Sequence, residues 1–407
     1  MNCRHCNKVS NYSFLDLGFA PPSNAYRTKV DLNKPEINYP LRVVVCDSCW
    51  LVQTEDFVYA DELFTKDYAY FSSTSISWLE HAKIYSKMIQ EKLNLNGNSF
   101  VVEIASNDGY LLKNFVEKSI PCLGIEPTSS TAKAAEKLGI PVKHEFFGSN
   151  FAKELVEDGN SADLIIGNNV YAHVPDIKDF TLGIKKLLRP SGTVTLEFAY
   201  LKNLIQENEF DTVYHEHFSY LSLHSVKTIF NSVGLKIYDV EELSTHGGSL
   251  RVYGCHKEIN FQITEKVQEQ LLIEKDCGLL DLETYVNFQK KAEKVKNDLL
   301  SFLIDQKNEG NPVVGYGAAA KGNTLINYGG IKQDLLPYVC DAAPSKQGKY
   351  LPGSNIPIFS PELIKKKKPP YILILPWNIS SEISKQLSFI RDWNGKFVTA
   401  VPEIHIF

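Results

Sequence analysis

Short apolar segments that alternate with amphipathic segments are the feature that most restricts the fold of this chain. Apolar runs at residues 100–105, 122–125, 162–167 and 193–198 each have the length of one strand, and stretches with helical periodicity separate them. Strands and helices that alternate at this spacing are typical of a parallel sheet with helices on both faces. The central part of the chain is therefore predicted to be a doubly wound α/β domain.

Further strand-like and helical runs continue this pattern toward the C-terminus. Two β-like runs at 235–240 and 249–255 enclose Gly247-Gly248, which predicts an antiparallel hairpin at an edge of the sheet. Residues 262–308 predict one or two connecting helices, and a second series of strands and helices starts at residue 312. A chain of 407 residues holds two or three domains at roughly 150 residues each. We expect three units, with bounds at 1–65, 66–260 and 261–407.

Charge and hydropathy argue against nucleic-acid and membrane partners. Lys and Arg number 43 while Asp and Glu number 48, so the net charge is −5, and this gives no general attraction to nucleic acid or anionic lipid. The longest apolar runs are far shorter than the roughly 20 residues that cross a bilayer. The N-terminus has neither the basic start nor the apolar centre of a signal peptide. We therefore expect a cytoplasmic protein.

Two close cysteine pairs mark the first 49 residues. Cys3 and Cys6 form one CxxC pair, Cys46 and Cys49 form the other, and 39 residues separate them. Four thiolates from two tight turns suit a closed tetrahedral Zn²⁺ site, which leaves no open position for a substrate. Because this proline-rich segment has little apolar material, we expect the zinc to be structural. Two unrelated CxxC pairs, or a redox pair, are the alternatives.

A four-cysteine module also suits a zinc-dependent nucleic-acid-binding or regulatory protein. Such a protein would carry a basic face near the cysteines. Residues 1–60 instead hold six Lys or Arg and six Asp or Glu, so this alternative is disfavoured.

The loop after the first central strand has the features of a nucleoside site. Glu103 lies within the strand, and Glu126 ends the next strand, 23 residues later. An acid at about this distance accepts hydrogen bonds from ribose hydroxyls. The loop lacks the GxGxxG glycines that let a pyrophosphate approach, which favours a cofactor with adenosine and no phosphates, S-adenosylmethionine (SAM). A turn with two incidental acids is the alternative. The residues expected to line the cofactor are Glu103, Ala105, Asn107, Asp108, Glu126, Asn168 and Asn169.

The tetrapeptide at 214–217, Tyr214-His215-Glu216-His217, is the densest group of titratable side chains. It follows a predicted strand, so it can reach the same sheet edge as His173, which follows another strand. Its two histidines stand two positions apart, unlike the i and i+4 pair of a helical zinc site. A histidine beside a carboxylate suits a general base, and a tyrosine phenol can hydrogen-bond a developing oxyanion.

A glycine-rich turn opens the C-terminal unit. Gly315, Gly317 and three alanines precede Lys321, after a short strand and at the start of a helix. Small residues at a helix N-terminus suit a phosphate, and Lys321 adds a positive charge, so a diphosphate site is expected here. Arg251, on the predicted hairpin, is a further phosphate candidate. The alternatives are a packing turn, or an NAD-dependent oxidoreductase with Asp341 as the ribose acid.

These motifs, in this order, resemble those of the nucleotide-sugar C-methyltransferases of deoxysugar biosynthesis, SAM-dependent enzymes that methylate carbon 3 of a 4-keto-hexose. The resemblance runs over nearly the whole chain. The segments that carry it are the four-cysteine module, Glu-Ile-Ala-Ser-Asn-Asp-Gly at 103–109, Gly-Ile-Glu-Pro at 124–127, Ala-His-Val-Pro at 172–175, Tyr-His-Glu-His at 214–217 and Ala-Lys-Gly-Asn-Thr at 320–324.

The resemblance implies a structural zinc module, a central Rossmann-like SAM domain and a C-terminal Rossmann-like domain, with the active site between the last two. It also implies that His217 is the base, with Tyr214 and Glu216 beside it and with His173 and Tyr68 facing the sugar. The expected substrate is a dTDP- or GDP-linked 4-keto-6-deoxyhexose, and the residues expected to bind it are Tyr70, Arg251, Lys321 and Asn323. A sugar O-methyltransferase is the nearest alternative. We expect a monomer or a weak homo-oligomer.

Overall fold

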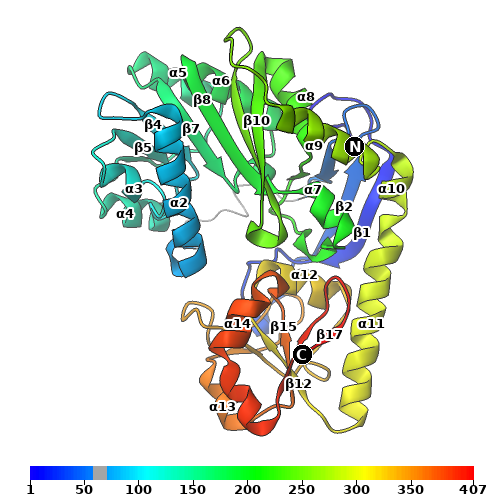
Figure 1. Ribbon diagram of the computed structural model, residues 1–407. Coiled ribbons are helices and arrows are strands. Elements are labelled where there is room, and N and C mark those ends of the chain that lie inside the picture. The colour runs from blue at the N-terminus through cyan, green and yellow to red at the C-terminus, as the bar shows by residue number, and fades with distance from the viewer. Residues whose placement is uncertain (58–70) are drawn as a thin grey trace.

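The computed structural model describes residues 1–57 and 71–407, which form three β-sheets arranged along the molecule (Figure 1). A four-stranded sheet belongs mainly to the N-terminal segment, a seven-stranded sheet to the central part and a six-stranded sheet to the C-terminal part. In Figure 1 the first two lie in the upper part of the molecule and the third lies below them. None of the helices in the described ranges is long and apolar enough to cross a membrane.

The N-terminal sheet is antiparallel and has the order β1-β2-β3-β9. Its strands are β1 (Tyr12–Ala20), β2 (Tyr39–Val45), β3 (Val52–Thr54) and β9 (Ser219–Tyr220). The expectation that this segment has little apolar material is wrong, because Phe14, Leu15, Val43 and Val45 are completely or almost completely buried. The ring of Phe14 stacks on Phe288 at 4.6 Å between centroids, so part of the core that holds this sheet comes from a distant helix.

The central sheet has the order β10-β11-β8-β7-β4-β5-β6 and confirms the predicted doubly wound domain. Its strands are β4 (Val101–Ile104), β5 (Cys122–Ile125), β6 (Val142–Lys143), β7 (Ala162–Asn168), β8 (Leu188–Ala199), β10 (Leu235–Leu243) and β11 (Ser249–His256). The strands β8, β7, β4, β5 and β6 are mutually parallel. The predicted hairpin is β10 and β11, which adds to β8 in antiparallel orientation.

Helices cover both faces of the central sheet because alternate residues of its strands are buried on opposite sides. One face packs against α2 (Ile76–Leu93) and α3 (Lys113–Val116), and the other against α5 (Ser149–Glu157), α6 (Ile177–Leu187) and α8 (Leu223–Val233). The helix α4 (Ser129–Glu136) follows β5. The hydroxyl oxygen of Ser75 caps the start of α2, accepting from the Trp78 N–H at 3.3 Å.

The C-terminal sheet has the order β14-β13-β12-β15-β16-β17 and is parallel except for β17. Its strands are β12 (Val313–Tyr316), β13 (Val339–Cys340), β14 (Ile358–Phe359), β15 (Tyr371–Ile374), β16 (Lys396–Thr399) and β17 (His405–Ile406). Its helices are α12 (Ala320–Tyr328), α13 (Glu362–Lys367) and α14 (Ser380–Gln386). This arrangement confirms the second α/β unit.

Three helices join the central and C-terminal sheets, where the sequence predicted one or two for residues 262–308. The first, α9 (Glu265–Asp276), packs against α8 and β10. After α10 (Leu282–Val286), the helix α11 (Phe288–Asn308) runs down one side of the molecule from the upper part to the lower part (Figure 1). One hydrophobic cluster contains residues of β1, α11, the central segment around Phe210 and the C-terminal strands, so the three parts share a continuous core.

Candidate active site and metal centre

The four predicted cysteine ligands come together in the N-terminal module. Their Sγ atoms lie within 4.8 Å of one another, and the Cys3–Cys49 and Cys6–Cys46 sulfur pairs are both 3.5 Å apart. Each CxxC pair forms a tight turn, in which the N–H of Asn7 donates to the Cys3 carbonyl and the N–H of Trp50 to the Cys46 carbonyl. Sulfur ligands about 2.3 Å from a tetrahedral zinc lie roughly 3.8 Å apart. The cluster therefore fits a closed Zn²⁺ site.

The loop after β4 is held in a special backbone conformation at the carboxyl edge of the sheet. Ala105, Asn107 and Gly109 have φ angles of 57°, 49° and 78°, which side chains rarely adopt. The N–H of Asn107 donates to Glu126 Oε2 at 3.0 Å, and the N–H of Thr128 donates to Oε1 of the same carboxylate at 2.9 Å. Glu126 thus ties the loop to the end of β5. Oε1 also accepts from the Thr128 hydroxyl, so the lone pair that remains for a ribose hydroxyl is the second one on Oε2.

Several buried polar atoms near this loop lack a partner among the described residues. They are the acceptors Glu103 Oε2, Asp108 Oδ1 and Asn168 Oδ1 and the donor Asn168 Nδ2. Burial, together with the charges of Asp108 and Glu126, raises the pKa of Glu103 well above its usual value. Buried polar groups are normally hydrogen-bonded. A ligand that brings hydroxyl and amino groups fits these acceptors, and SAM has both.

Asn168 and Asn169 stand at the end of β7 beside Glu197 of β8. Asn168 is paired with Glu197 in the parallel register. Asn169 has a φ of 53°, and its N–H donates to the Glu197 carbonyl at 2.7 Å. The predicted cofactor residues of β4, β5 and β7 therefore line up on one edge of three adjacent strands, where doubly wound sheets bind their ligands.

The imidazole of His217 has a defined tautomer. Its Nδ1 lies 2.9 Å from the Thr212 carbonyl oxygen, which can only accept, so Nδ1 carries a proton. In the neutral ring the lone pair is then on Nε2, which accepts the phenol of Tyr214 at 2.7 Å. The Tyr214 and His217 rings lie 4.0 Å apart. A neutral imidazole with its lone pair presented at Nε2 is equipped to remove a proton.

His173 lies beside this pair, as predicted. Its ring centroid is 4.6 Å from that of His217, and its Nδ1 donates to the Glu216 carbonyl at 2.8 Å. Burial lowers the pKa of His173 to about 4, although the hydrogen bond to the Glu216 carbonyl acts in the opposite direction. His173 is therefore neutral near pH 7 and can act as a hydrogen-bond partner without adding charge.

The two other members of the tetrapeptide contact the N-terminal segment. Glu216 Oε1 accepts from Asn24 Nδ2 at 2.7 Å. His215 faces away from His217, with Nε2 3.2 Å from the Pro40 carbonyl and its ring edge-on to Tyr39. No sequence motif pointed to Thr212 or Asn24, because both contact the tetrapeptide from outside any motif. Tyr68 and Tyr70 lie outside the described residues.

Three family models match the chain in succession. They are described as "Putative zinc binding domain" over residues 3–64, "Methyltransferase domain" over 79–240 and "C-methyltransferase C-terminal domain" over 244–402. The protein named C-methyltransferase NovU, from Streptomyces niveus, is 32% identical over 401 residues, which cover 98% of this chain and 95% of NovU. The chain belongs to the C-methyltransferase family. It is a SAM-dependent C-methyltransferase with an N-terminal zinc module.

Solved methyltransferase structures resemble the chain more weakly. Magnesium protoporphyrin IX methyltransferase from Synechocystis PCC 6803 with bound SAM is 14% identical, with a TM-score of 0.34 over 44% of this chain and 79% of that protein. A SAM-dependent methyltransferase from Clostridium acetobutylicum is 10% identical, with a TM-score of 0.36 over 44% of this chain and 92% of the other.

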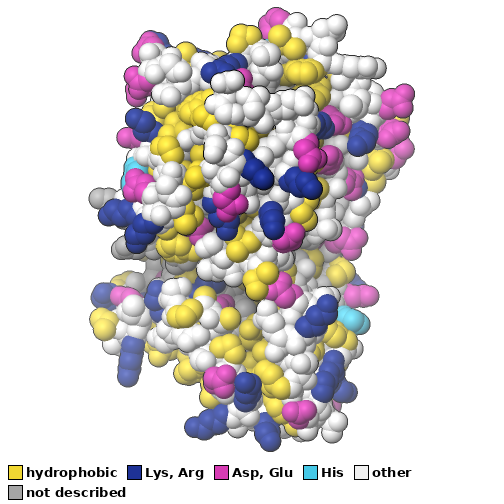
Figure 2. All heavy atoms as spheres, turned by 60° about the vertical axis from the view of Figure 1, so that its left-hand side comes forward, with side chains coloured by type: hydrophobic (Ala, Val, Ile, Leu, Met, Phe, Trp, Pro, Cys, Tyr) yellow, Lys and Arg dark blue, Asp and Glu magenta, His cyan; other side chains and the backbone are white. Residues whose placement is uncertain are grey.

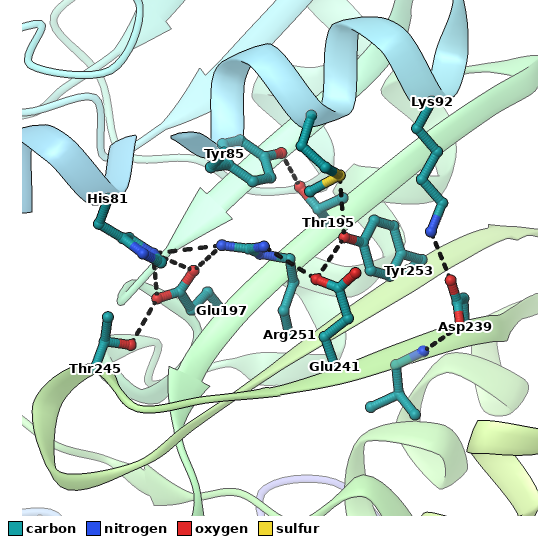
Figure 3. A network of polar contacts seen from close by, with 12 residues as sticks. His81, Tyr85, Lys92, Thr195, Glu197, Asp239, Glu241, Thr245, Arg251 and Tyr253 are labelled. Carbon is teal, nitrogen blue, oxygen red and sulfur yellow. Dashed lines mark hydrogen bonds and ion pairs between the residues drawn. The ribbon is translucent and has the colours of Figure 1, made fainter. Parts of the chain in front are cut away.

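Arg251 of this C-methyltransferase sits within a buried ion-pair network (Figure 3). Its guanidinium lies 2.7 Å from Glu197 and 3.2 Å from Glu241, above the ring of Tyr85 at 4.5 Å. Glu197 also contacts His81 Nε2 at 2.9 Å and accepts from the Thr245 hydroxyl at 3.2 Å. The sequence could not reveal these partners, since they come from α2, β8 and β10. Arg251 already has two carboxylate partners in this structure, and its role in binding phosphate stays a prediction.

Lys321 and Asn323 lie where the C-terminal domain meets the other two parts. Lys321 Nζ donates to Asn378 at 2.9 Å and lies 4.5 Å above the indole of Trp377. Burial lowers the pKa of Lys321, while the carboxylates of Asp211 and Glu209 oppose this shift. Asn323 Nδ2 donates to the Ser23 carbonyl at 2.6 Å. Their assignment to substrate binding stays a prediction.

Asp341 occupies the donors of the glycine-rich turn. Its Oδ2 accepts the N–H of Ala318 at 2.7 Å, and its Oδ1 accepts the N–H of Ala343 at 2.7 Å. A phosphate at this amide would meet a carboxylate of like charge, which argues against the expected diphosphate site at this turn as well as against the dinucleotide alternative. Membership of the C-methyltransferase family shows that the reaction is methyl transfer, in place of the oxidoreductase alternative.

On the face drawn in Figure 2, basic and acidic side chains are interspersed.

Proposed function

We propose that the enzyme methylates carbon 3 of a nucleotide-linked 4-keto-6-deoxyhexose, of the dTDP or GDP type, through an enolate. The observation that carries the proposal is the fixed tautomer of His217, whose Nδ1–H is held by the Thr212 carbonyl at 2.9 Å. Methylation of a carbon requires a carbanion equivalent, and a C–H next to a ketone is the kind of bond that an imidazole can ionise. Membership of the C-methyltransferase family supports methylation at carbon.

In this proposal His217 Nε2 removes the proton from carbon 3. The Thr212 carbonyl then stabilises the imidazolium, because it accepts from the ring nitrogen that carries the proton throughout. The phenol of Tyr214, which donates to Nε2 at 2.7 Å in this structure, turns to the ketone oxygen and stabilises the developing enolate charge. Neutral His173, whose ring centroid lies 4.6 Å from that of His217, provides a second polar contact for the sugar.

The cofactor residues are proposed to hold SAM in position and to take no part in proton transfer. When bound, SAM supplies an electrophilic methyl group, which the enolate carbon takes up. Glu126 is proposed to accept hydrogen bonds from the ribose hydroxyls of SAM. Glu103, Asp108 and Asn168 are proposed to bind the other donors of SAM, since Glu103 Oε2, Asp108 Oδ1 and Asn168 Oδ1 are buried and lack a partner among the described residues. Holding donor and acceptor carbons in line provides much of the rate in such reactions.

The remaining assignments complete the proposal. Lys321, Asn323 and Arg251 are proposed to contact the nucleotide-sugar, and Tyr68 and Tyr70 to enclose the sugar. The chain is proposed to divide at residues 65 and 260, to work in the cytoplasm in deoxysugar biosynthesis, and to be a monomer or a weak homo-oligomer.

Hydrogen exchange at the substrate tests the base. We would incubate the enzyme in heavy water with SAM replaced by S-adenosylhomocysteine, using a panel of dTDP- and GDP-4-keto-6-deoxy sugars, and follow the carbon 3 proton by NMR. The variant H217Q should lose this exchange by a factor of about 10²–10⁴, the usual contribution of a general base. The control H215Q changes the neighbouring histidine, which faces Pro40, and should retain it.

Two outcomes would contradict the proposal. Exchange that persists in H217Q would remove His217 as the base. Methyl transfer to a hydroxyl oxygen, located by mass spectrometry and NMR of the product with SAM present, would replace carbon methylation by the O-methyltransferase alternative.

A further inference from the structure

The carbonyl that fixes the His217 tautomer belongs to a short segment held by the C-terminal domain. Thr212 ends the 3-10 helix η4 (Phe210–Thr212), and its carbonyl accepts from His217 Nδ1 at 2.9 Å. The hydroxyl of Thr212 donates to the Glu209 carbonyl at 2.7 Å within the same turn. The position of this carbonyl therefore depends on how the segment 209–213 is held.

Both neighbours of Thr212 are hydrogen-bonded to side chains of the C-terminal domain. On one side, Trp377 Nε1 donates to Asp211 Oδ2 at 2.8 Å. On the other, Thr324 Oγ1 donates to the Val213 carbonyl at 2.8 Å. Asp211 is fully buried and Thr324 almost so. These two bonds flank Thr212, whose carbonyl is the acceptor for His217.

Packing and charge strengthen the same contact. The ring of Phe210 lies edge-on to Tyr328 of α12, with 5.7 Å between centroids. The positive charge of Lys321, also on α12, interacts favourably with the carboxylates of Asp211 and Glu209. The segment thus has apolar and hydrogen-bonded contacts, and a favourable charge interaction, with α12 and with the turn that begins at Trp377.

We propose that Trp377 and Thr324 are positioning residues for His217, acting through the Thr212 carbonyl. Neither contacts the imidazole, and their effect is to keep Nδ1 protonated and the lone pair on Nε2. The C-terminal domain then contributes to the chemistry of the central domain even at residues that do not bind substrate. The consequence for rate rests on the proposed base role of His217, whereas the imidazole geometry can be measured without substrate.

The first measurement reads the tautomer directly. Long-range ¹H–¹⁵N spectra of protein labelled with ¹⁵N-histidine distinguish the Nδ1–H from the Nε2–H form, and H217Q assigns the signal. W377F removes the Nε1 donor but keeps an aromatic ring over Lys321, and T324V removes the hydroxyl at nearly constant volume. We expect each variant to shift His217 away from the pure Nδ1–H signature, and the double variant to shift it further.

The matched controls remove equivalent bonds elsewhere. W393F deletes the indole donor to the Pro369 carbonyl, and T181V deletes the buried hydroxyl that donates to the Ile177 carbonyl. Both should keep the wild-type signature. SAM binding by calorimetry should be unchanged in all four single variants, since none of these residues is assigned to the cofactor, and it shows that the central domain is folded.

The second measurement is the rate of carbon 3 exchange in the heavy-water assay. Loss of one net hydrogen bond should slow exchange about tenfold in T324V and W377F, with a smaller change in KM for the sugar. A wild-type tautomer in both variants would overturn the proposal, even if H217Q confirmed the base. A shifted tautomer together with exchange that survives in H217Q would instead support the positioning and remove His217 as the base. If W377F did not fold, T324V alone would decide.

Discussion

Replacing Arg251 by Met should destabilise the central domain strongly, because it leaves a buried carboxylate without its main cation. The side chain of Glu197 is completely buried and that of Arg251 is 4% exposed, with 2.7 Å between them. Removing one partner of a buried ion pair costs about 3–5 kcal/mol. Each kcal/mol lowers the Tm of a domain of 150–250 residues by about 2–4 °C. We therefore expect R251M to melt roughly 6–20 °C below the wild type at neutral pH.

The pH dependence of this loss follows from the pKa of Glu197. Burial alone raises this pKa, but the hydrogen bond from His81 and the charge of Arg251 outweigh burial and lower it below 4.5. A carboxyl with a lowered pKa in the folded protein stabilises the fold above its unfolded pKa, and this contribution is lost as pH falls through the folded pKa. In R251M the pKa of Glu197 rises, so the carboxyl is protonated at higher pH. The Tm difference from wild type should therefore shrink on acidification.

Calorimetric melting of R251M between about pH 5 and 8, beside the control K153M, measures both effects. Lys153 forms an exposed pair with Glu157, and such pairs contribute little, so K153M should melt like the wild type. The double variant R251M/E197L should recover part of the loss, because no buried charge then remains at position 197. If R251M melted like K153M and changed only the KM for the sugar, the internal ion pair would not be the function of Arg251, and phosphate binding would be.

Two further predictions concern the metal and the cofactor. Elemental analysis of the purified protein should find one zinc, and C46S should lose the metal and melt at a lower temperature, because a three-cysteine site binds zinc less tightly. The control C277S, which lies outside the cluster, should keep the zinc. Zinc retained in C46S would contradict the four-thiolate site. By calorimetry, E126Q should bind SAM about 10- to 100-fold more weakly, which is the loss expected for a hydrogen bond to a charged group. The control E136Q, whose carboxylate pairs with His144 at the surface, should bind SAM like the wild type. Unchanged binding in E126Q would remove Glu126 from the cofactor site.

Patterns confined to one stretch of chain predicted the central fold well. The period of apolar residues located β4, β5 and β7, and Gly247-Gly248 located the hairpin, because those signals depend on neighbours in sequence. The N-terminal sheet was missed for two reasons. Bulges at Ser13/Leu15 and Asp16/Phe19 interrupt the alternation in β1, and the edge partner β9 is far away in the sequence.

The candidate site was predictable in its residue types but not in its contacts. The tetrapeptide at 214–217 drew attention to His217, yet the group that orients its Nδ1 is the backbone carbonyl of Thr212, which no side-chain motif can reveal. Arg251 is a similar case. An arginine near a glycine pair suggests a phosphate site, and only the pairing of β11 with β8 and β10 brings Glu197 and Glu241 to it.

The zinc module is linked to the candidate site by covalent neighbours and by hydrogen bonds. The strand β3 follows the second CxxC turn directly and pairs with β9, two residues after His217. Just beyond that pairing, Thr54 Oγ1 donates to the His217 carbonyl at 2.9 Å. Asn24 of the same segment holds Glu216. The N-terminal module therefore contacts the tetrapeptide and the C-terminal domain holds segment 209–213, so two domains outside its own position the segment that carries His217, the proposed base.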